Sequence, residues 1–69
     1  MSGLVKRSFS LAGHRTSVAL ELPFWEALAT CAAARGITLA RLVVEIDRDR
    51  TPEQPLASAL RVFALLWRA

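Results

Sequence analysis

The fold is decided by the stretch GITLARLV, which is Gly36-Ile37-Thr38-Leu39-Ala40-Arg41-Leu42-Val43. Gly36 suits the position just after a helix, because glycine readily adopts the left-handed conformation that ends many helices. Thr38 suits the start of the next helix, because its hydroxyl can accept a hydrogen bond from a backbone N–H of the first turn. Apolar residues then recur at the i, i+3, i+4, i+7 spacing of an amphipathic helix: Leu39, Leu42, Val43 and Ile46. The stretch therefore predicts two helices joined by a short turn, the second over residues 38–50.

The segments on either side predict two further helices, over residues 23–35 and 56–68. Pro23 suits a first helical turn, where its missing N–H is no loss. One side of this helix is apolar and carries Phe24, Trp25, Leu28, Cys31 and Ala32. The run Thr51-Pro52-Glu53-Gln54-Pro55 separates the second helix from the third. The third helix is apolar nearly all round, so we expect it to be buried on several sides, which requires a partner subunit.

Two short strands are predicted before the helices, over residues 4–11 and 15–22. In the first strand one face carries Val5, Arg7, Phe9 and Leu11, and the other carries Lys6, Ser8 and Ser10. In the second strand one face carries Thr16, Val18, Leu20 and Leu22. Such alternation is typical of a strand with one buried face. Ala12-Gly13-His14 supplies a turn, and the sequence leaves open whether the strands pair with each other or with a partner chain.

Length and composition indicate one small domain that associates with itself. The 69 residues allow a single domain over residues 1–69, and 54% of them are hydrophobic, a high share for so short a chain. A homodimer interface is the simplest place for that apolar surface. The most apolar stretch, residues 56–67, is shorter than a membrane span and contains Arg61. With no signal-peptide pattern and a single cysteine, we expect a cytoplasmic homodimer that does not associate with membranes.

The positive charge of the chain lies entirely in its N-terminal segment. Residues 1–20 contain Lys6, Arg7 and Arg15 and no acidic residue, whereas residues 21–69 contain six basic and six acidic residues, which gives the net charge of +3. This asymmetry favours an anionic partner, with nucleic acid the first candidate. The alternative is a solvated basic segment that keeps an apolar dimer in solution.

The order of strand, helix, glycine-x-hydroxyl turn and helix resembles the ribbon-helix-helix family over residues 15–50. The family also shows a glycine, a capping hydroxyl and a paired aliphatic in the stretch at residues 36–43. The chain looks most like a bacterial subgroup with an extra N-terminal strand and a third helix, on the basis of Gly13-His14-Arg15-Thr16-Ser17 and Ile46-Asp47. One departure is that Glu21 stands where the family commonly has proline, and Pro23 follows two residues later. The resemblance implies a mainly α fold with a short N-terminal β-ribbon, an intertwined homodimer and an additional C-terminal helix.

The resemblance also implies a transcriptional regulator whose ribbon reads the major groove of double-stranded DNA. If Thr16, Val18 and Leu20 point inward, the outward residues of the second strand are Arg15, Ser17 and Ala19. Arg15 can then bond O6 and N7 of guanine, Ser17 either base type, and Ala19 can touch a thymine methyl. Phosphates are expected at the helix N-terminus around Thr38 and Leu39. Sequence-independent attraction is expected from Lys6, Arg7 and His14.

Several of these assignments have a plainer alternative. Ser17 and Ala19 are as expected on any exposed strand face, and His14 fits a turn beside Gly13. Thr38 needs no ligand if it is only an N-cap. Glu21 lies on the same face as Arg15 and would be repelled by phosphate, which counts against DNA binding. Trp25 and Trp67 fit core or dimer contacts better than base-stacking platforms.

The sequence indicates no enzyme, cofactor or metal. One histidine and one cysteine cannot form a zinc site, and no glycine-rich phosphate loop is present. Cys31 lies on the apolar side of its helix, where it behaves as a small hydrophobe. Glu45, Asp47 and Asp49 stand among arginines and fit a solvated helix end.

Two other functions remain open at this point. An antitoxin-like or adaptor module would use the same fold to dimerise and to dock another protein without specific DNA binding, which the apolar third helix and Glu21 favour. Peripheral membrane attachment through the basic N-terminus and the third helix is a third hypothesis.

Overall fold

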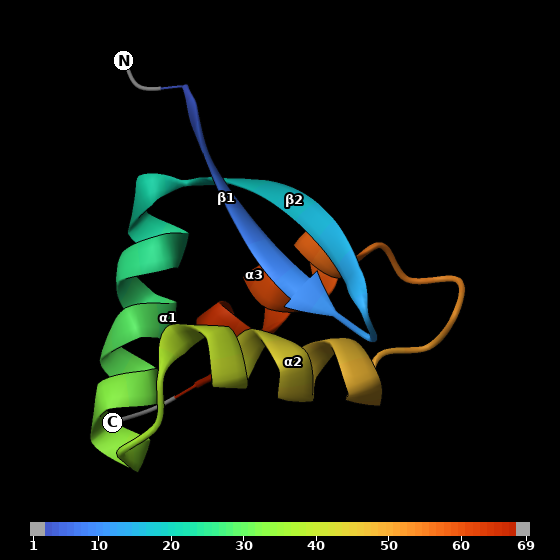
Figure 1. Cartoon of the computed structure of the whole chain (residues 1–69). Coiled ribbons are helices and arrows are strands. Elements are labelled where there is room, and N and C mark those ends of the chain that lie inside the picture. Colours follow the sequence, from blue (N-terminus) through green and yellow to red (C-terminus); the bar gives the residue numbers. More distant parts are fainter. Residues whose placement is uncertain (1–2, 68–69) are drawn as a thin grey trace.

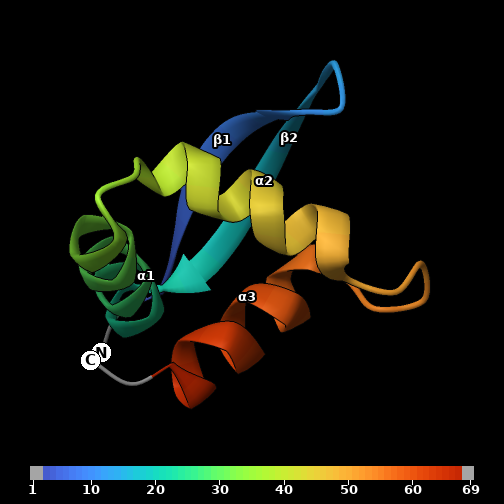
Figure 2. The same cartoon turned by 90° about the horizontal axis from the view of Figure 1, so that it is seen from below.

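The fold is a β-hairpin followed by three helices, and the computed structural model describes residues 3–67 (Figure 1). Strand β1 spans Leu4–Leu11 and β2 spans His14–Glu21. Helix α1 spans Leu22–Arg35, α2 spans Leu39–Asp49 and α3 spans Leu56–Leu66. Helix α2 contacts β1, α3 contacts β2, and α1 continues directly from the end of β2 (Figure 2). The predicted fold class, mainly α with a short N-terminal ribbon, is confirmed.

The element boundaries differ slightly from those expected. β2 starts at His14 and α1 starts at Leu22, each one residue earlier than predicted. Helix α2 spans Leu39–Asp49, inside the predicted range 38–50, and α3 ends at Leu66. Residue 68, the predicted end of α3, lies outside the described residues.

The two strands pair with each other within one chain. They are antiparallel, and the register places Leu11 opposite His14 and Leu4 opposite Glu21. Ala12 and Gly13 form the connection, with φ of 51° and 81° respectively. Positive φ at both central residues is the requirement of the type I′ turn, whose twist matches that of a hairpin. The sequence left open whether the two strands pair with each other or with a partner chain. This two-residue turn pairs them with each other.

Replacing Ala12 by asparagine is expected to stabilise the protein by about 1 kcal/mol. Ala12 holds a left-handed backbone conformation that costs an ordinary residue about 1–2 kcal/mol, whereas asparagine followed by glycine is favoured in this turn. Urea denaturation followed by circular dichroism measures the change. Gly13→Ala is the control and should have the opposite sign, because it places a side chain at φ 81°. A lower denaturation midpoint for Ala12→Asn would contradict this reading of the turn.

The joint between α1 and α2 has the capping geometry expected from the stretch at residues 36–43. Gly36 has φ 71°, and its N–H donates to the carbonyl of Ala33 at 3.1 Å. The N–H of Ile37 donates to the carbonyl of Ala32 at 3.0 Å, which completes a Schellman motif. The chain bends by 101° between the two helices. No single described helix is long and apolar enough to cross a bilayer; α1 and α2 reach that length and hydropathy only as this bent pair.

The core is built from all five elements. Its largest fully buried side chains are Trp25, Leu20, Leu28, Leu42 and Leu60. The inner face of the hairpin adds Phe9, Leu11 and Val18. Leu60 is 0% exposed, so α3 is an integral part of the core and not an appendage.

Helix α3 is buried on one side only within the single chain. Ala59 and Leu60 are buried, whereas Val62, Leu65 and Leu66 are exposed. The expected burial of this helix on several sides is thus not achieved by one chain, because no described element covers its outer side.

Candidate nucleic-acid interface

The outer face of the hairpin brings together side chains from both strands. Here "outer face" means the side turned away from the helices, which carries Lys6, Ser8, Ser10, Arg15, Ser17 and Ala19. Lys6 lies opposite Ala19, Ser8 opposite Ser17, and Ser10 opposite Arg15. All of these side chains are exposed except that of Ala19, which is half-buried. The face therefore combines two cations with a row of hydroxyls and one methyl group.

A hydrogen bond joins the two strands at the centre of this face. The Oγ atoms of Ser8 and Ser17 lie 3.1 Å apart, directly across the ribbon. A hydroxyl can both donate and accept, so each serine can still offer a hydrogen bond to a base edge. This cross-strand pair fixes the two side chains side by side on the exposed surface.

Arg7 lies on the inner side of the ribbon, away from Lys6 and Arg15. Its Cζ stands 5.4 Å from the centroid of the Trp25 ring, which is a cation–π contact. The indole Nε1 of Trp25 donates to the carbonyl of Val5 at 2.8 Å, so β1 is tied to α1 at this point. The structure thus separates Arg7 from the outer face, although its side chain is exposed.

His14 also lies off the outer face. It is the first residue of β2, pairs with Leu11 beside the turn, and is exposed. Its inner-face position separates it from Arg15, its neighbour in the chain.

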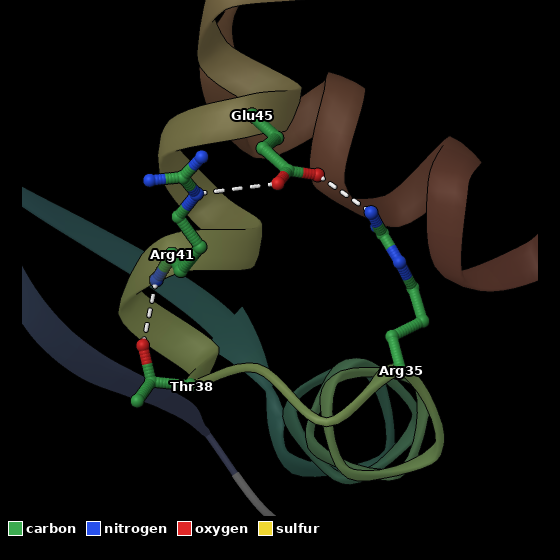
Figure 3. A network of polar contacts seen from close by, with 4 residues as sticks. All are labelled: Arg35, Thr38, Arg41 and Glu45. Carbon is green, nitrogen blue, oxygen red and sulfur yellow. Dashed lines mark hydrogen bonds and ion pairs between the residues drawn. The ribbon is translucent and has the colours of Figure 1, made fainter.

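The N-terminus of α2 forms a second polar site, separate from the outer face (Figure 3). The Thr38 Oγ1 accepts a hydrogen bond from the backbone N–H of Arg41 at 3.0 Å, which is the predicted N-cap. Leu39 is half-buried against the core. Glu45 accepts hydrogen bonds from Arg35 at 2.9 Å and from Arg41 at 3.3 Å.

Near the N-terminus of α2, two positively charged side chains stand beside one negatively charged side chain. Two guanidinium groups share the single carboxylate of Glu45 (Figure 3). The hydrogen bond from Arg35, followed by the one from Arg41, lowers the pKa of Glu45 below its ordinary value. Since the helix dipole also places partial positive charge here, this corner favours anions.

Glu21 lies at the end of the outer face, and its side chain is hydrogen-bonded to Arg61, a residue far away in the sequence. It is the last residue of β2, and its Oε1 accepts a hydrogen bond from Arg61 Nε of α3 at 3.0 Å. A hydrogen bond from its own backbone, followed by the one from Arg61, lowers the pKa of the Glu21 carboxyl. The carboxylate is therefore charged at neutral pH and directed to α3.

The order of these strands and helices agrees with the comparison of the sequence with known families. A sequence model described as the ribbon-helix-helix domain matches residues 4–68, nearly the whole chain. The chain belongs to the ribbon-helix-helix family. Ribbon-helix-helix proteins are typically non-enzymatic DNA-binding transcription regulators or antitoxins, and they generally act as dimers. Comparison with curated proteins and with solved structures gave no match.

In this ribbon-helix-helix chain the matched region begins at residue 4 and so includes β1. Here β1 of the same chain already pairs with β2. Ser8 and Ser10 consequently join the face, although sequence reasoning did not name them as site residues. The signal that could have found them is the turn: a two-residue loop sets the register and puts both serines opposite outward residues of β2.

Within residues 3–67, the ribbon-helix-helix chain shows no group of three or more His, Cys, Asp or Glu side chains that would form a metal site. Cys31 is 0% exposed and packs in the core, as its apolar surroundings in the sequence predict. Asp47 accepts a hydrogen bond from Arg50 at 2.8 Å. Two carboxylates of the predicted run, those of Glu45 and Asp47, are thus paired with arginines.

Proposed function

We propose that the protein is a dimeric DNA-binding transcription regulator of the bacterial cytoplasm that reads the major groove with the outer face of its hairpin. The observation that carries the proposal is the composition of that face, where cations and hydroxyls from both strands stand together while the apolar side chains point to the core. A two-stranded ribbon fits the major groove, where each base pair presents a distinct set of donors and acceptors.

The outer face divides into base-reading and phosphate-binding positions. In this proposal Arg15 bonds guanine, Ser17 contacts either base type and Ala19 touches a thymine methyl. Lys6 contributes attraction to phosphate. Arg7 and His14, which lie on the inner side of the ribbon, contribute only long-range attraction.

A phosphate contact at the start of α2 completes the proposed interface. Because the Thr38 hydroxyl already accepts from Arg41, the contact would use the backbone N–H of Leu39 in the first turn, where a helix offers no backbone acceptor. The excess of cations around Glu45 supports an anion at this corner.

The proposed dimer joins two hairpins edge to edge. A two-stranded sheet leaves one edge of each strand without a partner strand in the described residues. If β2 pairs with β2 of a second copy, as strands of this family do, the two β2 strands form a central two-stranded ribbon of the width that the major groove admits. β1 of each copy then flanks this ribbon, which puts Lys6 toward the phosphates. Such a dimer matches a pseudo-palindromic site with two equivalent half-sites.

The test is duplex binding, measured by fluorescence anisotropy on a site selected from random duplexes. We expect Arg15→Ala to weaken binding to the selected site by about 10- to 100-fold, because a bidentate arginine–guanine contact is worth about 1–3 kcal/mol. Lys6→Ala should weaken binding to every duplex and reduce the salt slope by about 1. The matched control is Arg48→Ala, which removes one charge from an exposed position on α2.

Two outcomes would contradict the DNA proposal. One is a folded protein that binds no duplex at low salt. The other is an equal loss for Arg15→Ala and Arg48→Ala, because binding would then depend on total charge and not on the outer face.

The exposed side of α3 supports a second candidate function, a module that docks another protein without specific DNA binding. Val62, Leu66, Ile46 and Phe63 supply apolar side chains to a groove of about 550 Å³ between α2 and α3, which Arg35, Glu45, Asp49 and Arg50 also line. Exposed apolar surface of this kind commonly marks an interface. A folded dimer that leaves no large apolar patch on α3 would count against this candidate.

A further inference from the structure

Glu21 lies on the same side of β2 as the outer face, so its negative charge would stand beside bound DNA. It continues the outer-face series of Arg15, Ser17 and Ala19, and it lies opposite Leu4. It is also the only acidic residue between residues 4 and 21. A carboxylate at this place would repel the phosphates that Lys6 and Arg15 attract.

The structure provides a partner for this carboxylate from the far end of the chain. Arg61 of α3, 40 residues away in sequence, donates from Nε to Glu21 Oε1 at 3.0 Å. Its Cζ also lies 5.8 Å from the centroid of the Phe24 ring at the start of α1. The guanidinium thus contacts both a carboxylate and an aromatic ring. The three elements that carry these side chains, β2, α1 and α3, contact one another (Figure 2).

The ion pair between Arg61 and Glu21 is expected to contribute little to the stability of the fold. The Arg61 and Glu21 side chains are 35% and 44% exposed, and exposed ion pairs add little to the free energy of folding. Its location at the end of the outer face suggests a different role.

We propose that Arg61 is a positioning residue for DNA binding, which holds the Glu21 carboxylate against α3 and cancels the single negative charge of the hairpin. The inference rests on the proposed function. It assigns α3 a part in recognition without contact between α3 and DNA. Loss of Arg61 leaves an uncompensated carboxylate beside the phosphates, whereas removal of both charges restores a surface that DNA accepts.

The test is a double-mutant cycle on affinity for a labelled duplex of mixed sequence, measured at low and at physiological salt. We expect Arg61→Ala to weaken binding by about 3- to 10-fold at low salt, and less as salt screens the carboxylate. Glu21→Gln should bind as well as the wild type or better. The double variant Arg61→Ala/Glu21→Gln should bind within about twofold of Glu21→Gln, because no charge remains to repel the phosphates.

Controls separate charge from folding. Circular dichroism melts establish that each variant is folded. If Arg61→Ala melts early, Arg61→Met replaces it, because methionine is also uncharged but can still pack against the Phe24 ring. Arg61→Lys retains the charge and should bind close to the wild type. Arg48→Ala, on the exposed side of α2, removes an equal charge elsewhere.

Each contrary outcome has a distinct meaning. Wild-type affinity for both Arg61→Ala and Arg61→Met, in a protein that binds DNA, would overturn the role of Arg61 and leave the proposed function intact. A double variant as weak as Arg61→Ala would show that Arg61 contacts DNA directly, which also overturns the inference. A folded wild-type protein that binds no duplex would overturn the proposed function, and this inference with it.

Discussion

Replacing Trp25 by alanine is expected to lower the free energy of unfolding by about 3–5 kcal/mol, the usual cost of deleting a buried aromatic side chain. Trp25 is 1% exposed, and its ring centroid lies 5.8 Å from that of Phe9. Its Nε1 donates to the carbonyl of Val5, so the side chain joins α1 to the inner face of β1. Since small domains have only about 0.05–0.15 kcal/mol of stability per residue, this loss approaches the whole stability of the chain.

Trp25→Phe is the matched control for this prediction. Phenylalanine keeps an aromatic ring in the core but cannot donate to Val5, which we expect to cost about 1–3 kcal/mol. Urea denaturation followed by far-ultraviolet circular dichroism measures both variants. Equal effects for the two substitutions would show that the ring does not anchor the hairpin to α1.

Leu60→Ala should have the second largest effect, a loss of about 2–5 kcal/mol in the free energy of unfolding. Leu60 is 0% exposed and is the main anchor of α3 in the core. The cavity left by its truncation would open between α3 and the rest of the chain, because neighbouring side chains collapse only partly into it. Differential scanning calorimetry should show a lower Tm.

The control for Leu60 lies on the same helix. Leu66→Ala removes the same atoms from a side chain that is 68% exposed, so the stability of the single chain should change little. Similar losses for both variants at low protein concentration would contradict the placement of α3. A loss for Leu66→Ala that appears only at concentrations where the protein is dimeric would instead support an interface on the outer side of α3.

The site residues that lie together on a single strand could be predicted from the sequence. Alternation in residues 15–22 indicated that Arg15, Ser17 and Ala19 share a side, and the structure places all three on the outer face. Sequence reasoning could not separate Arg7 from Lys6 in function. The two residues lie on opposite faces of β1, and the contact of Arg7 with Trp25 in the tertiary structure is what assigns Arg7 to the inner side.

The sequence by itself determined the local features of this protein. Caps, a glycine in the left-handed conformation, period-two alternation and helical spacing all depend on residues a few positions apart, so they can be read along the chain. Tertiary structure decided the contact of Arg61 with Glu21 and the exposure of one side of α3. These depend on side chains up to 40 residues apart, and no local preference selects among the partners available to them. Packing of the whole chain makes that selection, because Trp25, Leu28 and Leu60 from two different helices are buried together in one close-packed core.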